Sequence, residues 1–269
     1  MEIGHRDELT PEQRADWDAL CGAMVQAMSA LCRPYLTPIS QELNANQGQL
    51  EGSGAYLEFA GKRWLISNEH VLEHWASLQY THEFIGCEHP FRLLAPPRAI
   101  EKHPIDAALW EIPDPVWHLH PHHCDAIPAS RLADRHAPVD GELLFFCGYP
   151  QERSHCMFGT LASVAVPIVM QECRPPTVED LHPNYLLLGY SPEHAQRVDP
   201  RGRSLPDAAG LSGSLVWNTR LVECVQQHRT WSPDLAQVTG MLVRSDTQLV
   251  AVQMVRIEVI RDFLERNAR

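Results

Sequence analysis

The first stretch of the chain with a regular hydrophobic pattern has the period of an α-helix. From residue 10 to residue 32, apolar side chains recur three and four residues apart on one face: Trp17, Leu20, Cys21, Met24, Val25, Met28 and Leu31. Thr10 suits the N-cap, and Pro11 suits the first turn. Pro34 ends the pattern. We predict an amphipathic helix that packs on the rest of the protein. The alternatives are a docking face for a partner and a self-inhibiting element.

After residue 55 the apolar runs become short, which is typical of strands. Residues 55–59 and 63–67 flank the turn Gly61-Lys62 and predict a hairpin. Further strands are predicted at 107–112, 142–147, 159–170, 185–190, 214–218, 237–243 and 247–254. Residues 113–140 are rich in Pro, His and Asp without periodicity, and they predict a linker between two β units. Residues 255–267 regain a helical pattern and predict a closing amphipathic helix.

The segment Gly210-Leu211-Ser212-Gly213 is the most informative motif. The glycines allow a sharp turn, and the amides of Gly210 and Ser212 can point together as an oxyanion hole. Upstream, His70 follows an apolar strand and Asp106 precedes another. A histidine can take the serine proton as general base, while an aspartate holds the histidine tautomer. Each residue alone also occurs in ordinary turns, but together they predict nucleophilic catalysis by Ser212.

These residues resemble the trypsin-like (chymotrypsin-fold) serine peptidases, in their compact bacterial form without structural disulfides. The resemblance extends from about Gly52 to Val255. It includes Gly52-Ser53-Gly54, similar to the opening of the first barrel, and residues 146–150, similar to the strand end that begins the second. Residues 240–244 and 249–254 resemble the two closing strands. The resemblance implies an all-β fold of two Greek-key antiparallel β-barrels of the trypsin type, with an N-terminal and a C-terminal helix.

The same resemblance divides the chain. It implies an N-terminal helical extension over 1–50, a trypsin-like peptidase domain over 51–255 and a C-terminal helix over 256–269. The first barrel then spans about 51–133 and the second about 140–255. The catalytic residues His70, Asp106 and Ser212 would meet between the two barrels.

The resemblance also implies where the substrate pocket lies. Its lining would come from the residues just before the nucleophile and from one closing strand: Pro206, Asp207, Ala208, Ala209, Leu242, Val243 and Arg244. Asp207 is one position away from the aspartate that gives the family's basic specificity. An acidic pocket is therefore one reading, and the alanine and aliphatic side chains favour a small or apolar one.

Two departures from the family pattern carry information. Glu69 stands where the family usually has alanine. It either points to solvent or lies close to His70, where its charge would favour the protonated imidazole and weaken the base. Leu211 replaces the aspartate that pairs with a new N-terminal amine after zymogen cleavage. We therefore expect a different route of activation.

The composition of the chain limits the classes of binding partner that we expect. The net charge of −12, without a Lys/Arg run, opposes binding to nucleic acid. No apolar stretch approaches the ~20 residues that cross a bilayer, and residues 1–10 hold no signal-peptide core. We expect a cytoplasmic protein without nucleic-acid or membrane partners and without a cofactor. The eight cysteines include no Cys-x-x-Cys pair, so we expect free, buried thiols.

A histidine tract offers a second kind of chemistry. His118, His120, His122, His123 and Cys124 are ligand types for zinc or nickel. Pro121 interrupts the tract, and no second spaced pair completes a four-ligand site. We therefore predict a solvated loop without a metal, and metal binding is kept as a competing hypothesis.

Together these features predict an intracellular serine endopeptidase that cleaves protein or peptide substrates through an acyl-enzyme. The alternative is a catalytically silent trypsin-like binding module in a larger complex. A cytoplasmic protease without a PDZ-like segment needs control, so we expect activation by a protein partner, as in a bacterial stress or phage-defence system. The polar loop 191–209 leads into the oxyanion turn and is the segment that we expect such a partner to order.

Overall fold

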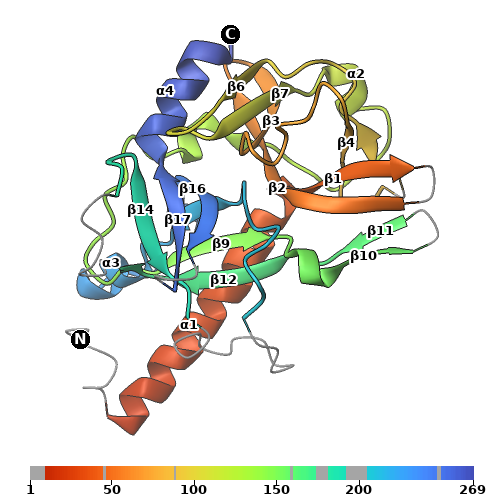
Figure 1. Cartoon of the computed structure of the whole chain (residues 1–269). Helices are drawn as coiled ribbons and strands as arrows, with labels where there is room; N and C mark the ends of the chain where they lie inside the picture. Colours follow the sequence, from red (N-terminus) through yellow and green to blue (C-terminus); the bar gives the residue numbers. More distant parts are fainter. Residues whose placement is uncertain are drawn as a thin grey trace.

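The computed structural model describes residues 10–44, 47–87, 89–157, 160–173, 181–191, 205–246 and 250–269. Within these ranges the chain folds into two curled antiparallel sheets, each forming a half-barrel, with a helix near each end of the chain (Figure 1). Residues before 130 build the first sheet, and residues after 140 build the second. Each half of the chain therefore forms its own sheet, as predicted.

The N-terminal helix is α1 (Pro11–Cys32). Thr10 and Gln13 form a capping box: Thr10 Oγ1 accepts from the Gln13 N–H at 3.2 Å, and Gln13 Oε1 accepts from the Thr10 N–H at 3.0 Å. The helix packs against β9 (Leu144–Gly148) and β12 (Val166–Met170) of the second sheet (Figure 1). Its inward face is buried: Trp17, Cys21, Met24, Val25, Met28 and Cys32. The predicted helix is confirmed, and its apolar face is covered by the protein itself.

The first sheet contains eight strands among the residues that the structure describes. Seven lie in the order β5-β4-β1-β2-β3-β7-β6, and the short β8 pairs in parallel with β2. Their bounds are β1 (Leu36–Asn44), β2 (Gln47–Phe59), β3 (Lys62–Ser67), β4 (Gln79–His82), β5 (Phe91–Arg92), β6 (Ala99–Glu101), β7 (Ala107–Glu111) and β8 (Ile127–Pro128). The neighbours β4-β1-β2-β3 form a Greek key.

The hairpin of β1 and β2 begins before the predicted start of the peptidase domain. Strand β1 and the first residues of β2 belong to the first sheet, although the sequence placed 1–50 in a helical extension. The end of β1 near Asn44 is exposed, because the hairpin extends beyond the core. Because the residues of this end are polar, they lack the alternation of apolar side chains by which a strand is predicted from sequence.

The second sheet has the order β12-β9-β15-β16-β17-β14-β13 within the described ranges. The strands not yet given are β13 (Glu172–Cys173), β14 (Tyr185–Gly189), β15 (Leu215–Asn218), β16 (Gln237–Asp246) and β17 (Ala251–Arg256). Residues 247–249, predicted as the start of the last strand, lie outside the described residues. The remaining helices are α2 (Asp114–Trp117), α3 (Leu221–Gln226) and α4 (Ile257–Asn267), the last confirming the predicted closing helix.

One predicted strand, 159–170, is divided in the structure. Strands β10 (Ser154–Met157) and β11 (Thr160–Ser163) form a separate hairpin, and only β12 joins the second sheet. The β10–β11 hairpin contacts β2, and Figure 1 shows it beside the β1–β2 hairpin. Residues 158–159 lie outside the described residues.

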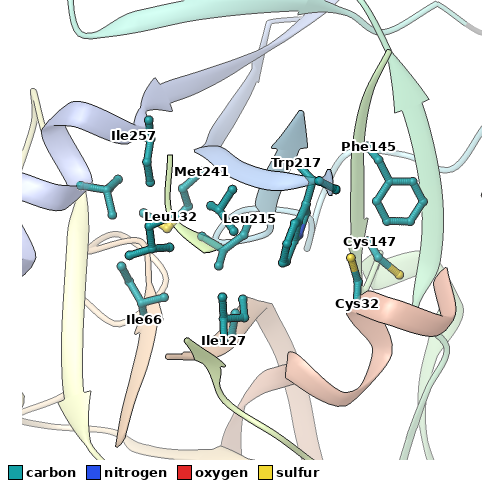
Figure 2. Close-up of a cluster of buried hydrophobic side chains, with 14 of the residues drawn as sticks. Cys32, Ile66, Ile127, Leu132, Phe145, Cys147, Leu215, Trp217, Met241 and Ile257 are labelled. Atoms are coloured by element: carbon teal, nitrogen blue, oxygen red, sulfur yellow. The ribbon is translucent and has the colours of Figure 1, made fainter. Parts of the chain in front are cut away.

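The largest buried cluster joins both sheets and both terminal helices. Figure 2 shows its centre, with Cys32 of α1, Ile66 and Ile127 of the first sheet, Leu215, Trp217 and Met241 of the second, and Ile257 of α4. Close packing of such a core fixes the relative position of the two sheets. Residues carried by different sheets can therefore meet in a defined geometry between them. Within the described ranges, no helix is both long enough and apolar enough to cross a membrane.

Candidate active site

His70 and Asp106 are in direct contact. Strand β3 pairs with β7, with Ser67 opposite Ala108, so the turns that carry the two residues lie at the same end of the strand pair. His70 Nδ1 lies 2.7 Å from Asp106 Oδ2, and the His70 backbone N–H donates to Oδ1 at 3.1 Å. An ionised carboxylate only accepts hydrogen bonds, so Nδ1 carries the proton and Nε2 is left as an acceptor.

The two side chains differ in exposure, as expected for a base that contacts a substrate and a partner that does not. The His70 side chain is 42% exposed, whereas that of Asp106 is only 10% exposed. Asn68, which the sequence reasoning did not single out, holds the aspartate backbone: its Nδ2 donates to Asp106 O at 2.8 Å. Asp106 has φ 52, a left-handed conformation that aspartate tolerates better than most residues. The carboxylate is therefore held in place by local backbone geometry.

The turn that carries Ser212 requires its glycines. Gly210 has φ 89 and Gly213 has φ 88, and a Cβ on Gly210 would lie 2.5 Å from Tyr149 O. The turn is tied to β2: the Ser53 N–H donates to Ser212 O at 2.8 Å, and Ser53 Oγ donates to Gly210 O at 2.8 Å. We assigned Ser53 no role from the sequence beyond its place in the motif that resembles the opening of the first barrel. Its contacts show that it supports the turn.

Two amides of this turn have no hydrogen-bond acceptor among the described residues. They are the N–H groups of Gly210 and Ser212, whereas the amides of Leu211 and Gly213 donate to backbone carbonyl oxygens. Because unpaired N–H groups are costly unless a ligand or water meets them, the two are suited to an incoming anionic oxygen. They are the amides that the motif assigned to an oxyanion hole, and that role stays a prediction.

Gly52 packs between the Ser212 turn and Val71. A Cβ on Gly52 would lie 2.7 Å from Val71 Cγ2 and 3.1 Å from Ser212 O, so both residues pack against this glycine. Val71 directly follows His70. The Ser212 hydroxyl donates to Val243 O at 2.9 Å, and within the described part of the chain no hydrogen bond joins it to His70. A transfer of its proton to His70 therefore requires rotation of the Ser212 side chain.

The two departures from the family pattern are both buried. Glu69 is 7% exposed, and its Oε1 lies 3.8 Å from Lys102 Nζ, so a cation offsets part of its charge. The solvent-facing reading of Glu69 is wrong, because little of the side chain reaches water. Leu211 is 1% exposed and packs with Leu242 in a cluster of the second sheet. A core leucine thus occupies this position beside the nucleophile.

The predicted pocket residues separate into several environments. Pro206, Ala208 and Leu242 lie near one another around the Leu211 cluster: Ala208 and Leu242 pack in it, and Pro206 is buried beside them with its carbonyl accepting from Tyr190. Val243 belongs to the main core, while Asp207 and Ala209 are exposed and joined by a bond from the Ala209 N–H to Asp207 Oδ1 at 2.9 Å. Their role as a substrate pocket stays a prediction.

Arg244 differs from the rest of this set. It is exposed on β16, and its Nε donates to Gln253 Oε1 of β17 at 3.1 Å. It directly follows Val243, whose carbonyl accepts from the Ser212 hydroxyl. Its predicted place in the substrate pocket stays a prediction.

Part of the histidine tract packs on the first sheet and is not a solvated loop as predicted. The His122 ring stacks on Phe84 with centroids 4.4 Å apart, and its Nε2 bonds to Trp117 O at 2.7 Å. Cys124 Sγ accepts from the Ile85 N–H at 3.0 Å, and burial raises the pKa of this thiol to about 12. Among the residues that the structure describes, no group of three or more His, Cys, Asp or Glu side chains is placed to hold a metal ion.

Comparison with known proteins bears on the fold. No family model matches the chain, and no curated protein matches it. Among solved structures, the chain is similar to the active form of the Rv3671c protease from M. tuberculosis, at 16% identity over 91% of this chain and 86% of that chain, with a TM-score of 0.50. It also matches a structure from work on the Sesbania mosaic virus VPg protein, at 15% identity over 88% of this chain and 92% of that chain, with a TM-score of 0.46. The first likeness shows the fold, which is trypsin-like, as predicted.

Proposed function

We propose that this protein is a serine endopeptidase with Ser212 as nucleophile, His70 as general base and Asp106 as the partner of the base. The observation that carries the proposal is the 2.7 Å contact between His70 Nδ1 and Asp106 Oδ2. It leaves Nε2 of an accessible imidazole free to accept a proton, and we propose that the proton comes from the glycine-framed Ser212. The trypsin-like fold supports this reading, since such a constellation lies between its two half-barrels.

The reaction starts with rotation of the Ser212 hydroxyl from Val243 O toward Nε2 of His70. Nε2 takes the hydroxyl proton as Oγ attacks the substrate carbonyl, and Asp106 stabilises the imidazolium. Negative charge develops on the former carbonyl oxygen and is met by the amides of Gly210 and Ser212. The imidazolium then protonates the leaving amine. Water, deprotonated by the same imidazole, releases the acyl group.

An exposed strand edge is available for the acyl part of the substrate. Strand β15 begins at Leu215, opposite Met241, whereas β16 continues to Asp246. Residues 244–246 pair with β17 on one side, and within the described ranges no strand pairs with them on the other. An extended peptide can add to such an edge through its backbone. This edge begins beside Val243, so it leads a bound peptide to Ser212.

Covalent labelling tests the nucleophile. A fluorophosphonate probe is expected to modify the protein at Ser212, because the proposal assigns the base His70 and the amides of Gly210 and Ser212 to this serine. Ser212→Ala should abolish the modification, and Ser214→Ala, a matched change two residues away, should retain it. Mass spectrometry of the labelled peptide identifies the site. Modification of another serine would reject Ser212, and a folded protein that the probe does not modify even when its activator is present would favour the silent binding module.

We further propose that the isolated chain has low basal activity and is activated by a protein partner. The Ser212 hydroxyl rests on Val243 O, and Leu211 offers no zymogen ion pair. Most of the predicted control loop, residues 192–204, lies outside the described residues. Casein hydrolysis by the purified protein should stay within about tenfold of the Ser212→Ala background, a barrier difference of about 1.4 kcal/mol. Rapid casein turnover by the chain alone would contradict partner activation. A role in a stress or phage-defence system stays a prediction.

A further inference from the structure

Glu51 occupies an irregular position beside the nucleophile turn. Along the β1–β2 pair, Ile39 lies opposite Gly52 and Ser40 lies opposite Leu50, so Glu51 is an extra residue without a partner on β1. Such a β-bulge re-aims a side chain and is frequent next to active sites. Gly52, the next residue, is the glycine that packs against Ser212 O. The bulged residue, which carries a carboxylate, is therefore the direct neighbour of the glycine that packs against the Ser212 turn.

The carboxylate of Glu51 lies near His74 and Tyr80 but is bonded to neither. In the part of the chain that the structure describes, no hydrogen bond or ion pair involves it, and the side chain is only partly exposed. Burial raises the pKa of Glu51, and the nearby His74 opposes this shift. Glu51 in turn raises the pKa of Tyr80, after the larger effect of burial. A carboxylate kept partly out of water without a partner is suited to a cation that arrives with a ligand.

Neighbouring carboxylates on this side of the molecule are already paired. Glu42 of β1 accepts two hydrogen bonds from Arg92, at 2.8 and 2.7 Å. Glu73 lies 2.9 Å from Nε2 of His74. Glu42 thus has an arginine partner within the chain, and Glu73 contacts the ring of His74. Glu51 differs from both in its position in the bulge between Leu50 and Gly52 and in having no hydrogen bond or ion pair among the described residues.

The position of Glu51 decides which part of a substrate it meets. Ser212 lies between the exposed edge of β16 and strand β2, because its hydroxyl contacts Val243 O while its carbonyl accepts from Ser53. With the acyl segment on the β16 edge, we expect the segment beyond the scissile bond to leave on the side of Ser212 where β2 lies. Gly52 is buried there, and Glu51 is the partly exposed residue next to it, so we expect the leaving segment to pass Glu51.

We propose that Glu51 is a specificity-determining residue that selects substrates with lysine or arginine in the first residues after the cleaved bond. The proposal rests on the proposed peptidase function. A basic side chain supplies the cation that Glu51 lacks, and the ion pair forms at a partly shielded site. For such a pair we expect a preference of about fivefold in kcat/KM for lysine over alanine, and a larger one over glutamate, where like charges repel.

The test is cleavage-site profiling with a peptide library, followed by kinetics on matched peptides that carry lysine, alanine or glutamate after the cleaved bond. Wild-type protein, with any activator it needs, should prefer lysine mainly through KM. Glu51→Gln should remove the preference, and Glu51→Lys should reverse it toward glutamate. Glu58→Gln is the matched control, because Glu58 is an exposed carboxylate farther along the same strand and should leave the preference unchanged.

Binding to the Ser212→Ala variant provides a second measurement that needs no turnover. The same three peptides should bind it in the same order, and Glu51→Gln should equalise them. Ser212-dependent cleavage without a charge preference overturns the role of Glu51 and leaves the peptidase function intact. Absence of Ser212-dependent cleavage overturns the peptidase function. Equal binding of the three peptides to Ser212→Ala overturns the Glu51 proposal in either case.

Discussion

In the presence of any activator that the wild-type protein needs, Asp106→Asn is expected to lower the turnover of an activated ester by about 10⁴-fold while the protein stays folded. Asparagine can present an N–H to His70 Nδ1, which then favours the tautomer with its proton on Nε2. Such an imidazole cannot take the Ser212 proton. The present contact of 2.7 Å, in which Nδ1 must donate, would be lost. Steady-state kinetics with a p-nitrophenyl ester and thermal unfolding of the same samples measure the two quantities.

A matched control for this change is Asp16→Asn, which alters an exposed carboxylate on α1, a helix that packs on the second sheet. It should leave both ester turnover and unfolding temperature unchanged. The His70→Ala variant should lose activity to a similar extent as Asp106→Asn, and the double variant should lose little more, because the two side chains act as one unit. A loss below tenfold in Asp106→Asn would remove Asp106 from the proposed mechanism.

Gly213→Ala is expected to destabilise the protein by about 3 kcal/mol or more and to abolish labelling of Ser212. A residue with a side chain pays roughly 1–2 kcal/mol for the left-handed backbone at φ 88. In addition, a Cβ at this position would lie 2.0 Å from Ser53 O and 2.5 Å from Ser67 Oγ, so the backbone of β2 must shift. Overpacking of this kind adds about 1–3 kcal/mol. Urea denaturation and fluorophosphonate labelling measure the effects.

Gly61→Ala separates the two causes of the expected destabilisation, which are the left-handed backbone and the clash of the new Cβ with β2. Gly61 also has a positive φ, 75, but a Cβ there would meet no atom within 4 Å. It should lose only the conformational contribution, about 1 kcal/mol, and retain labelling. If Gly213→Ala were no more destabilising than Gly61→Ala, the tight packing of the Ser212 turn against β2 would be disproved.

Helix α1 and the Ser212 turn were both predictable, because their signals are local. Apolar spacing with a suitable capping residue specifies a helix within one segment, and glycines that adopt positive φ specify a turn within a few residues. The hairpin of β2 and β3 follows equally from its turn and its alternating strands. The trypsin-like fold itself was predicted from the resemblance of His70, Asp106, Ser212 and several flanking motifs to the trypsin-like peptidases.

The tertiary structure decided the features that depend on distant partners. The polar end of the β1–β2 hairpin, the bulge at Glu51 and the packing of His122 on Phe84 arise from register and contacts between segments. Hydrophobic periodicity does not report such contacts. The position of the Ser212 hydroxyl on Val243 O is likewise set by a strand 31 residues away in the sequence. Local sequence thus determined which groups are available for chemistry, and the packing of the two sheets determined where each one lies.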